Sequence, residues 1–297
     1  MRYLDPKADL TFKKVFGRHP DLLISLLNAL LPLSDDEQIE SVEYLQSELV
    51  PELYEHKNSI VDVLCKDVCG RMFCVEMQME WTTAFKQRVL FNASKLYVTQ
   101  AHKSERYSDL HPVYSLNLVN DIVEDGLDGE FIHDYDIVHD KHSDRVIEGL
   151  HFTFIELPKF KPGTMLEKRM AVLWLRFLTE ISDHTKVVSP ELLESPPINK
   201  ALEEVKVTAF TEEELRAYDK FWDSVRTEKT LQHDSEKKGR EVGRAEGRAE
   251  GLAEGRAEGK LEQQMESARI MLASGLTKDD VVRFTGLNLK QVEQLGL

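Results

Sequence analysis

The chain has 297 residues, 41% of them hydrophobic, and a formal net charge of −15. This length suits one substantial core with an appendage. No apolar run approaches the ~20 residues of a membrane-spanning helix, the first residues lack the features of a signal peptide, and the three cysteines match no zinc spacing. We therefore expect a cytoplasmic protein without a membrane partner or a zinc site.

The charges are distributed unevenly along the chain. A negative net charge argues against a nucleic-acid partner, because binding to phosphate is mostly cationic. Residues 35–56 carry eight acidic residues and no Lys or Arg, and residues 121–140 carry only acidic charges. Residues 57–107, in contrast, hold eight Lys or Arg against five carboxylates. This positive stretch keeps a nucleic-acid partner open.

The apolar periodicity predicts a mixed α/β sheet flanked by helices. Two short helices are expected within residues 7–31, the second ending before Pro32, followed by an edge strand or an extended segment over residues 39–55. Strands are then predicted at 58–67, 72–80, 112–119 and 150–160, a weaker strand at 131–140, and helices at 82–102, 168–182 and 201–229.

A different pattern follows, with glycine at every fourth position from Gly239 to Gly259. Each such Gly costs a helix up to ~1 kcal/mol relative to Ala. The tract is therefore either a loosely helical spacer or a helix that pairs with a second subunit, giving a homodimer. We expect a domain of residues 1–230, a helical spacer of residues 231–264 and a small helical tail of residues 265–297.

The tail contains short amphipathic segments separated by Gly275 and Gly286. Their arrangement resembles a small helix-turn-helix, in which the second helix enters a DNA groove. A small helical cap or an oligomerisation element explains the same pattern equally well.

The predicted hairpin "SIVDVLCKDVCGRMFCVEMQ", residues 59–78, has a carboxylate near the centre of each strand, Asp62 and Glu76. A tight turn at Gly70 would bring them together on one face, with Gln78 pointing the same way. Two partly buried carboxylates repel each other, and a divalent cation such as Mg²⁺, which prefers oxygen ligands, removes that repulsion. The spacing therefore suggests a metal site.

A metal site of this kind can hydrolyse phosphodiesters, because the cation polarises the phosphoryl oxygen and acidifies a water molecule. Lys57, Lys86 and Arg88 could hold backbone phosphates. Spacing alone leaves an alternative open, in which Asp62 faces solvent and Glu76 pairs with Lys66 or Arg71 across the hairpin.

Four stretches follow one another along the chain, "DLTFKKVFG", "KNSIVDVLCKDVCGRMFCVEMQ", "RVLFNASKLYVTQ" and "ERYSDLHPVYSLNLV". In this order they resemble the bacterial Rpn family of recombination-promoting nucleases, also labelled PD-(D/E)XK nuclease family transposases. The resemblance covers roughly residues 5–160 and extends to the glycine repeat and helical tail. It implies a restriction-endonuclease-like core with a mixed four-stranded sheet, and DNA cleavage with Mg²⁺, or with Mn²⁺ or Ca²⁺ in its place.

Carried over by motif, Asp62 and Glu76 would be metal ligands, and Met77 would offer its backbone carbonyl. Gln78 stands where the wider superfamily places Lys, so it departs from that pattern. Because Gln is neither a base nor a cation, its expected role is to orient water. Asp9 is a further candidate ligand from the first helix, with helix capping as the alternative.

The resemblance also suggests Arg88 and Gln100, on the helix after the hairpin, as polar groups of the active site that contact DNA, with solvated surface positions as the simpler alternative for each. The leading hypothesis is a metal-dependent DNA endonuclease of low sequence specificity, linked to recombination, mobile elements or phage defence. The alternative is a catalytically inactive DNA-binding or assembly protein that acts through its helical tail. Nothing in these residues separates strand transfer, as in transposition, from hydrolysis.

Overall fold

The computed structural model describes residues 2–46, 48–49, 59–101, 106–124, 127, 129–163 and 168–295. The chain forms two compact units, Met1–Thr227 and Glu228–Leu297. The long helix α7 (Glu212–Ala273) begins in the first unit and continues in the second. The finer division into residues 1–230, 231–264 and 265–297 stays a prediction.

A mixed six-stranded sheet forms the centre of the first unit, with the strand order β1-β4-β5-β6-β8-β7. Its strands are β1 (Val42–Tyr44), β4 (Val63–Asp67), β5 (Met72–Gln78), β6 (Val113–Val119), β7 (Ile132–His139) and β8 (His142–Glu156), and a separate pair contains β2 (Glu48–Leu49) and β3 (Ser59–Ile60). β6 lies parallel to both β5 and β8, and the remaining pairs are antiparallel. The sheet has two strands more than the four that the resemblance implies, because β1 and β7, which lie where the sequence predicts an edge strand and a weaker strand, extend it at its two edges.

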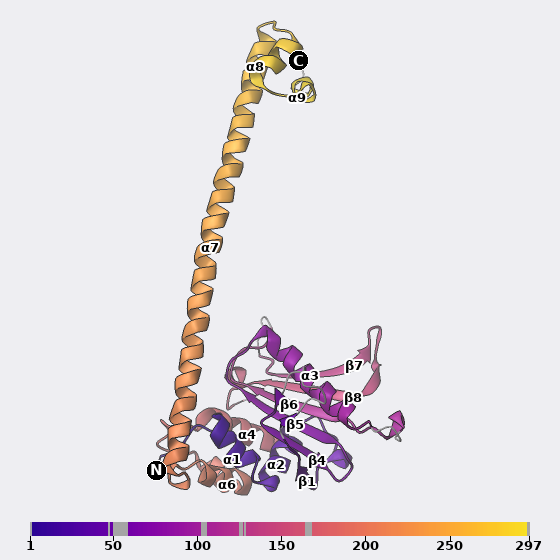
Figure 1. Ribbon diagram of the computed structural model, residues 1–297, viewed down its shortest axis with the longest axis vertical. Helices are drawn as coiled ribbons and strands as arrows, with labels where there is room; N and C mark the ends of the chain where they lie inside the picture. The colour runs from indigo at the N-terminus through magenta and orange to yellow at the C-terminus, as the bar shows by residue number, and fades with distance from the viewer. Residues whose placement is uncertain are drawn as a thin grey trace. The chain divides into compact units, whose positions relative to one another are not determined.

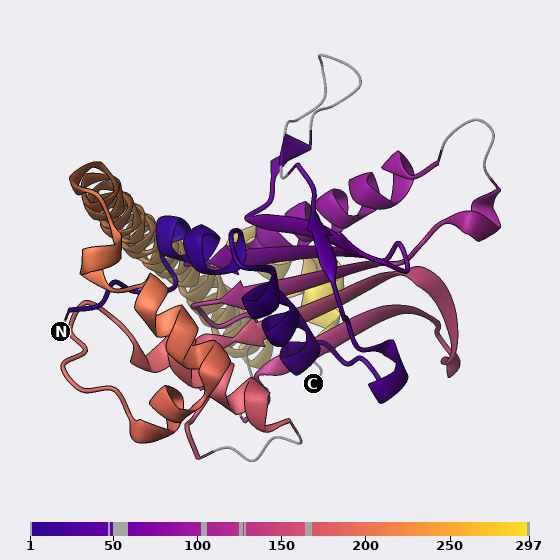
Figure 2. The same ribbon diagram turned by 90° about the horizontal axis from the view of Figure 1, so that it is seen from below.

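Helices cover both faces of this sheet, as Figures 1 and 2 show. The first unit contains α1 (Asp9–Phe16), α2 (Pro20–Leu30), α3 (Thr83–Thr99), α4 (Arg169–Glu180), α5 (Pro190–Glu194) and α6 (Pro196–Glu204). Because side chains alternate along a strand, Val63 and Val75 join the core with α2 and α4, whereas Leu64 and Cys74 pack with Ala93 of α3. The predicted α/β fold with flanking helices is confirmed.

The structure interrupts two of the predicted elements. The strand expected over 58–67 breaks around Asp62, between β3 and β4. The helix expected over 201–229 divides into α6 and α7, because the segment between them hydrogen-bonds with the N-terminus. The N–H of Leu4 donates to the carbonyl of Val205 at 2.8 Å, and the N–H of Val207 donates to the carbonyl of Arg2 at 3.1 Å.

The second unit consists of the rest of α7 followed by α8 (Lys278–Thr285) and α9 (Leu289–Gln294). The glycine tract is helical, and a Cβ placed at each of its glycines would meet no atom within 4 Å. A small core of Ala268, Val281, Leu287 and Val292 joins the three helices. None of the described helices is both long and apolar enough to cross a membrane.

Candidate active site

The hairpin brings Asp62 and Glu76 together, as the sequence predicts. Val63 is paired with Val75 in the antiparallel register of β4 and β5, so the next positions outward, Asp62 and Glu76, oppose each other on one face. Asp62 Oδ2 accepts a hydrogen bond of 2.8 Å from the backbone N–H of Met77. The side chain of Asp62, which lies just before β4, is thus hydrogen-bonded to the main chain of the neighbouring strand β5.

Glu76 is buried at 5% exposure under two residues of α3. Asn92 Nδ2 donates to Glu76 Oε1 at 2.9 Å, and Arg88 Nη2 lies 3.5 Å from Oε2. Arg88 and Asn92 are four residues apart, so they lie on the same side of the helix. This side of α3 therefore faces the carboxylate pair.

Lys13 of α1 approaches the pair from the other direction. Its Nζ lies 3.6 Å from Asp62 Oδ1 and 2.5 Å from Asp9 Oδ1. The two central carboxylates thus share one pattern. One oxygen of each accepts a good hydrogen bond from an amide N–H, and the other faces a cation at 3.5 or 3.6 Å, which is beyond a strong hydrogen bond.

Burial raises the pKa of both central carboxylates. For Asp62 the charge of Asp9 adds to the increase, while the Met77 N–H and Lys13 oppose it. For Glu76 the charge of Asp62 adds to it, while Asn92 and Arg88 oppose it. Burial lowers the pKa of Lys13, but Asp9 and Asp62 outweigh that effect and raise it. A further positive charge at the pair would favour both ionised carboxylates.

The donor set fits a hard divalent cation. Mg²⁺ in proteins usually binds one or two carboxylates and keeps several waters. Asp62 Oδ1 and Glu76 Oε2 are the two oxygens of the pair without a close amide partner, and Met77, the residue after Glu76, adds a backbone carbonyl. Within the described ranges no three His, Cys, Asp or Glu gather into a cluster, so the fit rests on these two carboxylates, with the carbonyl and water.

Gln78 holds Arg88 in this arrangement. Gln78 Oε1 accepts from Arg88 Nη2 at 2.7 Å, and Gln78 Nε2 donates to the backbone carbonyl of Glu80 at 2.7 Å. Both ends of the amide are therefore engaged with protein groups. The geometry gives Gln78 a role in positioning Arg88, beside the predicted role in orienting water.

Two of the predicted DNA-contacting residues lie away from the pair. Lys86 is ion-paired with Glu124. Gln100 exchanges two hydrogen bonds with the backbone of His111, at 2.9 and 3.0 Å, and twelve helical positions, about 18 Å, separate it from Arg88. Lys57 lies outside the described residues.

The alternative pairing across the hairpin is wrong. Lys66 pairs with Glu43 at 3.1 Å, and Arg71 pairs with Asp67 at 2.6 Å. The Asp62 side chain is 22% exposed and therefore does not face bulk solvent.

The sequence interpretation missed two residues of the site, Lys13 and Asn92. Each stands four positions after a residue that it did single out, Asp9 and Arg88 respectively. Residues at i and i+4 share a helix face, so this spacing was a signal that could have found both.

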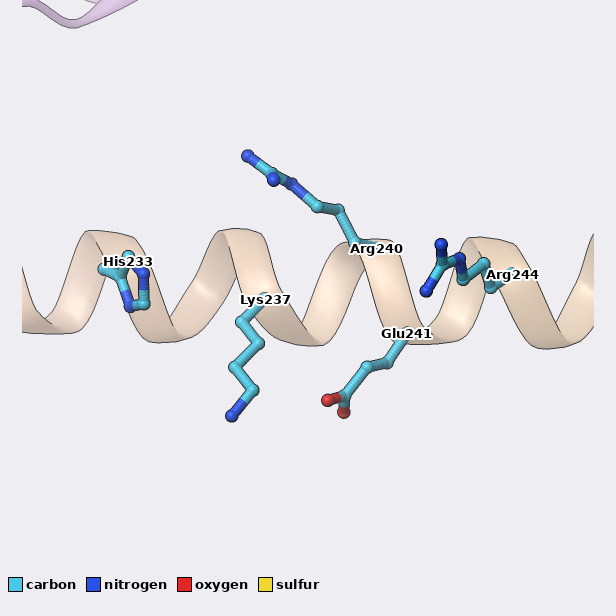
Figure 3. Close-up of a pocket in the computed structure, with 5 residues that line it drawn as sticks. All are labelled: His233, Lys237, Arg240, Glu241 and Arg244. Atoms are coloured by element: carbon cyan, nitrogen blue, oxygen red, sulfur yellow. The ribbon is translucent and has the colours of Figure 1, made fainter.

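Basic residues also gather on α7, around a hollow of about 540 Å³ lined by His233, Lys237, Arg240, Glu241 and Arg244. Figure 3 shows Lys237 and Glu241 on one side of the helix and Arg240 on the other. The five lining residues come from a single helix and include one carboxylate. This hollow therefore lacks the paired acids of the hairpin.

The sequence model of one protein family, described as PD-(D/E)XK nuclease family transposase, matches residues 6–233. This range includes the sheet, the pair Asp62 and Glu76, and their partners described above, Lys13, Met77, Arg88 and Asn92. No curated protein and no solved structure matches the chain in the corresponding comparisons.

Proposed function

Because the chain belongs to the PD-(D/E)XK nuclease family transposases, we propose that it is a metal-dependent DNA endonuclease. The observation that carries this proposal is the facing pair of Asp62 and Glu76, in which one oxygen of each carboxylate is anchored by an amide. The other oxygens are positioned to bind a divalent cation, with Mg²⁺ the first candidate and Mn²⁺ or Ca²⁺ the alternatives.

Each residue near the pair has a distinct task in this proposal. Asp62, Glu76 and the carbonyl of Met77 would hold the cation, which when bound supplies Lewis acidity toward a phosphoryl oxygen and acidifies water. Arg88, fixed by Gln78 and half exposed, is placed to bind a phosphate of the DNA backbone. Phosphate contacts carry no sequence information directly, which supports low sequence specificity.

Plasmid nicking tests the proposal. We expect the purified protein to nick supercoiled plasmid with Mg²⁺ and to lose this activity in EDTA. Asp62→Ala should lower the rate of nicking at least about a hundredfold, because it removes a ligand of the cation. The variant should keep the native circular dichroism spectrum, because it removes one of two repelling charges. Cleavage by a folded Asp62→Ala protein would refute the assignment of the site, and an inactive wild type, repeated with Mn²⁺ and Ca²⁺, would refute the nuclease.

The alternative function, DNA binding through the helical tail, has weaker support. Residues 265–295 carry four basic and four acidic residues. A DNA-binding surface normally has a clear excess of positive charge. The physiological link to recombination, mobile elements or phage defence rests on the family alone, and the cytoplasmic location stays a prediction.

A homodimer through the glycine tract also stays a prediction, and helix geometry limits how it could form. A four-residue repeat drifts by about 40° per step around an α-helix, so the stripe from Gly239 to Gly259 turns by about 200°. A straight partner helix would therefore meet only a few consecutive glycines, at a crossing point. Sedimentation of the full chain and of a Gly247→Leu, Gly251→Leu double variant would test this interface.

A further inference from the structure

Lys13 occupies a distinctive place between two carboxylates from different elements. One turn of α1 separates it from Asp9, whose Oδ1 lies 2.5 Å from Lys13 Nζ, and Asp62 Oδ1 lies 3.6 Å from the same nitrogen. The first contact is a close ion pair and the second is loose. The ammonium is therefore anchored on α1 and leans toward the start of β4.

The oxygen that Lys13 faces is the one that a cation would need. Asp62 Oδ2 is already engaged with the N–H of Met77 at 2.8 Å, so Oδ1 is the oxygen left to bind a metal. A Lys ammonium and a divalent cation compete for such an oxygen, because both are attracted by the same charge and repel each other.

Arg88 differs from Lys13 in the partner that holds it. Arg88 donates to Gln78 at 2.7 Å, which fixes its guanidinium beside Glu76. The partner of Lys13 is Asp9, whose side chain is half exposed. Rotation about the flexible Lys13 stem can thus move the ammonium away from Asp62 without shifting the backbone and without breaking its ion pair with Asp9.

We propose that Lys13 is an internal counter-ion of Asp62 that a divalent cation displaces, and that it thereby sets the affinity of the site for metal. The inference rests on the proposed function in one respect, that Asp62 is a cation ligand. Lys13 acts through Asp62, so it is a positioning residue and not a catalytic one.

Isothermal titration calorimetry with Mg²⁺ alone, on the full-length protein without DNA, tests the inference. Lys13→Met keeps the length of the side chain and removes its charge, so Mg²⁺ should bind about threefold or more tightly than to the wild type. Lys13→Arg keeps the charge and should leave the affinity at or below the wild-type value. The increase in Mg²⁺ affinity of Lys13→Met over the wild type should become smaller as the salt concentration is raised from a low value to about 0.5 M, because salt screens the competing charge.

Lys66→Met is the matched control, because it removes the same charge from an ion-paired lysine whose side chain is about as exposed as that of Lys13. Lys66 pairs with Glu43 and lies four strand positions, about 13 Å, from Asp62. Its Mg²⁺ affinity should equal that of the wild type. An equal gain in Lys66→Met and Lys13→Met would overturn the specific role of Lys13, since the effect would then be one of overall charge.

The outcomes separate this inference from the proposed function. Mg²⁺ binding by the wild type that Asp62→Asn abolishes and Lys13→Met leaves unchanged or weakens would overturn the inference and keep the metal site. A wild type that binds no Mg²⁺ would overturn both. Should Lys13→Met fail to fold, Lys13→Gln gives the same test, with an increased affinity expected.

Discussion

Glu76 and Glu156 are two buried carboxylates in the same sheet, and they differ in how their oxygens are bound. Glu156, at the end of β8, is fully buried. His133 Nε2 lies 2.7 Å from its Oε1, and Lys159 Nζ lies 3.0 Å from its Oε2. Glu76 has one close partner, Asn92, and a cation at 3.5 Å.

The pKa values of Glu76 and Glu156 are therefore shifted in opposite directions. Burial raises the pKa of both, but at Glu156 the hydrogen bonds from Lys159, from the backbone N–H of Val123 and from His133 reverse the effect and lower it. At Glu76 burial prevails, and the pKa is raised. Glu156, with a cation at 3.0 Å and several hydrogen-bond partners at Oε1, is compensated within the protein, whereas Glu76, with one amide donor and a cation at 3.5 Å, still lacks compensating positive charge. This difference is what marks the hairpin as a site.

The largest expected effect is on stability. Glu156→Gln leaves Lys159 without its buried counter-charge, and the free energy of unfolding should fall by about 3 kcal/mol. Glu76→Gln removes a charge that burial already disfavours, and the free energy should stay unchanged or rise by up to about 1 kcal/mol. Urea unfolding followed by tryptophan fluorescence measures both variants. Equal destabilisation would remove the distinction between the two carboxylates.

Acidification should protonate Asp62 and Glu76 at a higher pH than Glu156. The raised pKa values mean that Asp62 and Glu76 take up protons at a higher pH than ordinary carboxylates, so Mg²⁺ affinity should fall first. The pKa of Glu156 is lowered, so its stabilising contribution is present above its unfolded value and is lost only as the pH falls through its lower folded value.

Mg²⁺ calorimetry and thermal unfolding, each measured from pH 7 to pH 3, check this order. Folded protein that no longer binds Mg²⁺ is expected in the mildly acidic part of the range. Unfolding at a higher pH than the loss of Mg²⁺ would contradict the assignment.

The smallest effect is expected from Asn92→Ala. It removes the hydrogen bond to Glu76 Oε1 and should lower the free energy of unfolding by about 1 kcal/mol. Because that bond favours the ionised carboxylate, its loss should raise the pKa of Glu76 further and move the acid limit of Mg²⁺ binding to higher pH. Asn28→Ala, which removes an amide bound to the backbone of Ile39, should reduce stability without moving that limit.

Much of the site could be predicted from local patterns. A two-residue period and a turn at Gly70, where φ is 84°, were enough to place Asp62 opposite Glu76. The sequence analysis named both Lys86 and Arg88 as residues that could hold phosphates. Residues two apart on a helix, however, point to different sides. Lys86 accordingly pairs with Glu124, and of these two residues Arg88 is the one that approaches Glu76, at 3.5 Å.

The sequence by itself determined the order of helices and strands, the carboxylate pair and the family, because these depend on periodicity, turn residues and motif order. Only the tertiary structure decided that Lys13 faces Asp62, that Gln78 holds Arg88, and that the chain breaks between α6 and α7. Helix spacing places Lys13 beside Asp9, but its approach to Asp62, the contact of Gln78 with Arg88 and the pairing of the N-terminus with residues 205–207 each join different elements, so they depend on how those elements pack. The burial that raises the pKa values of Asp62 and Glu76 is likewise a product of packing, since it requires α3 to cover the sheet.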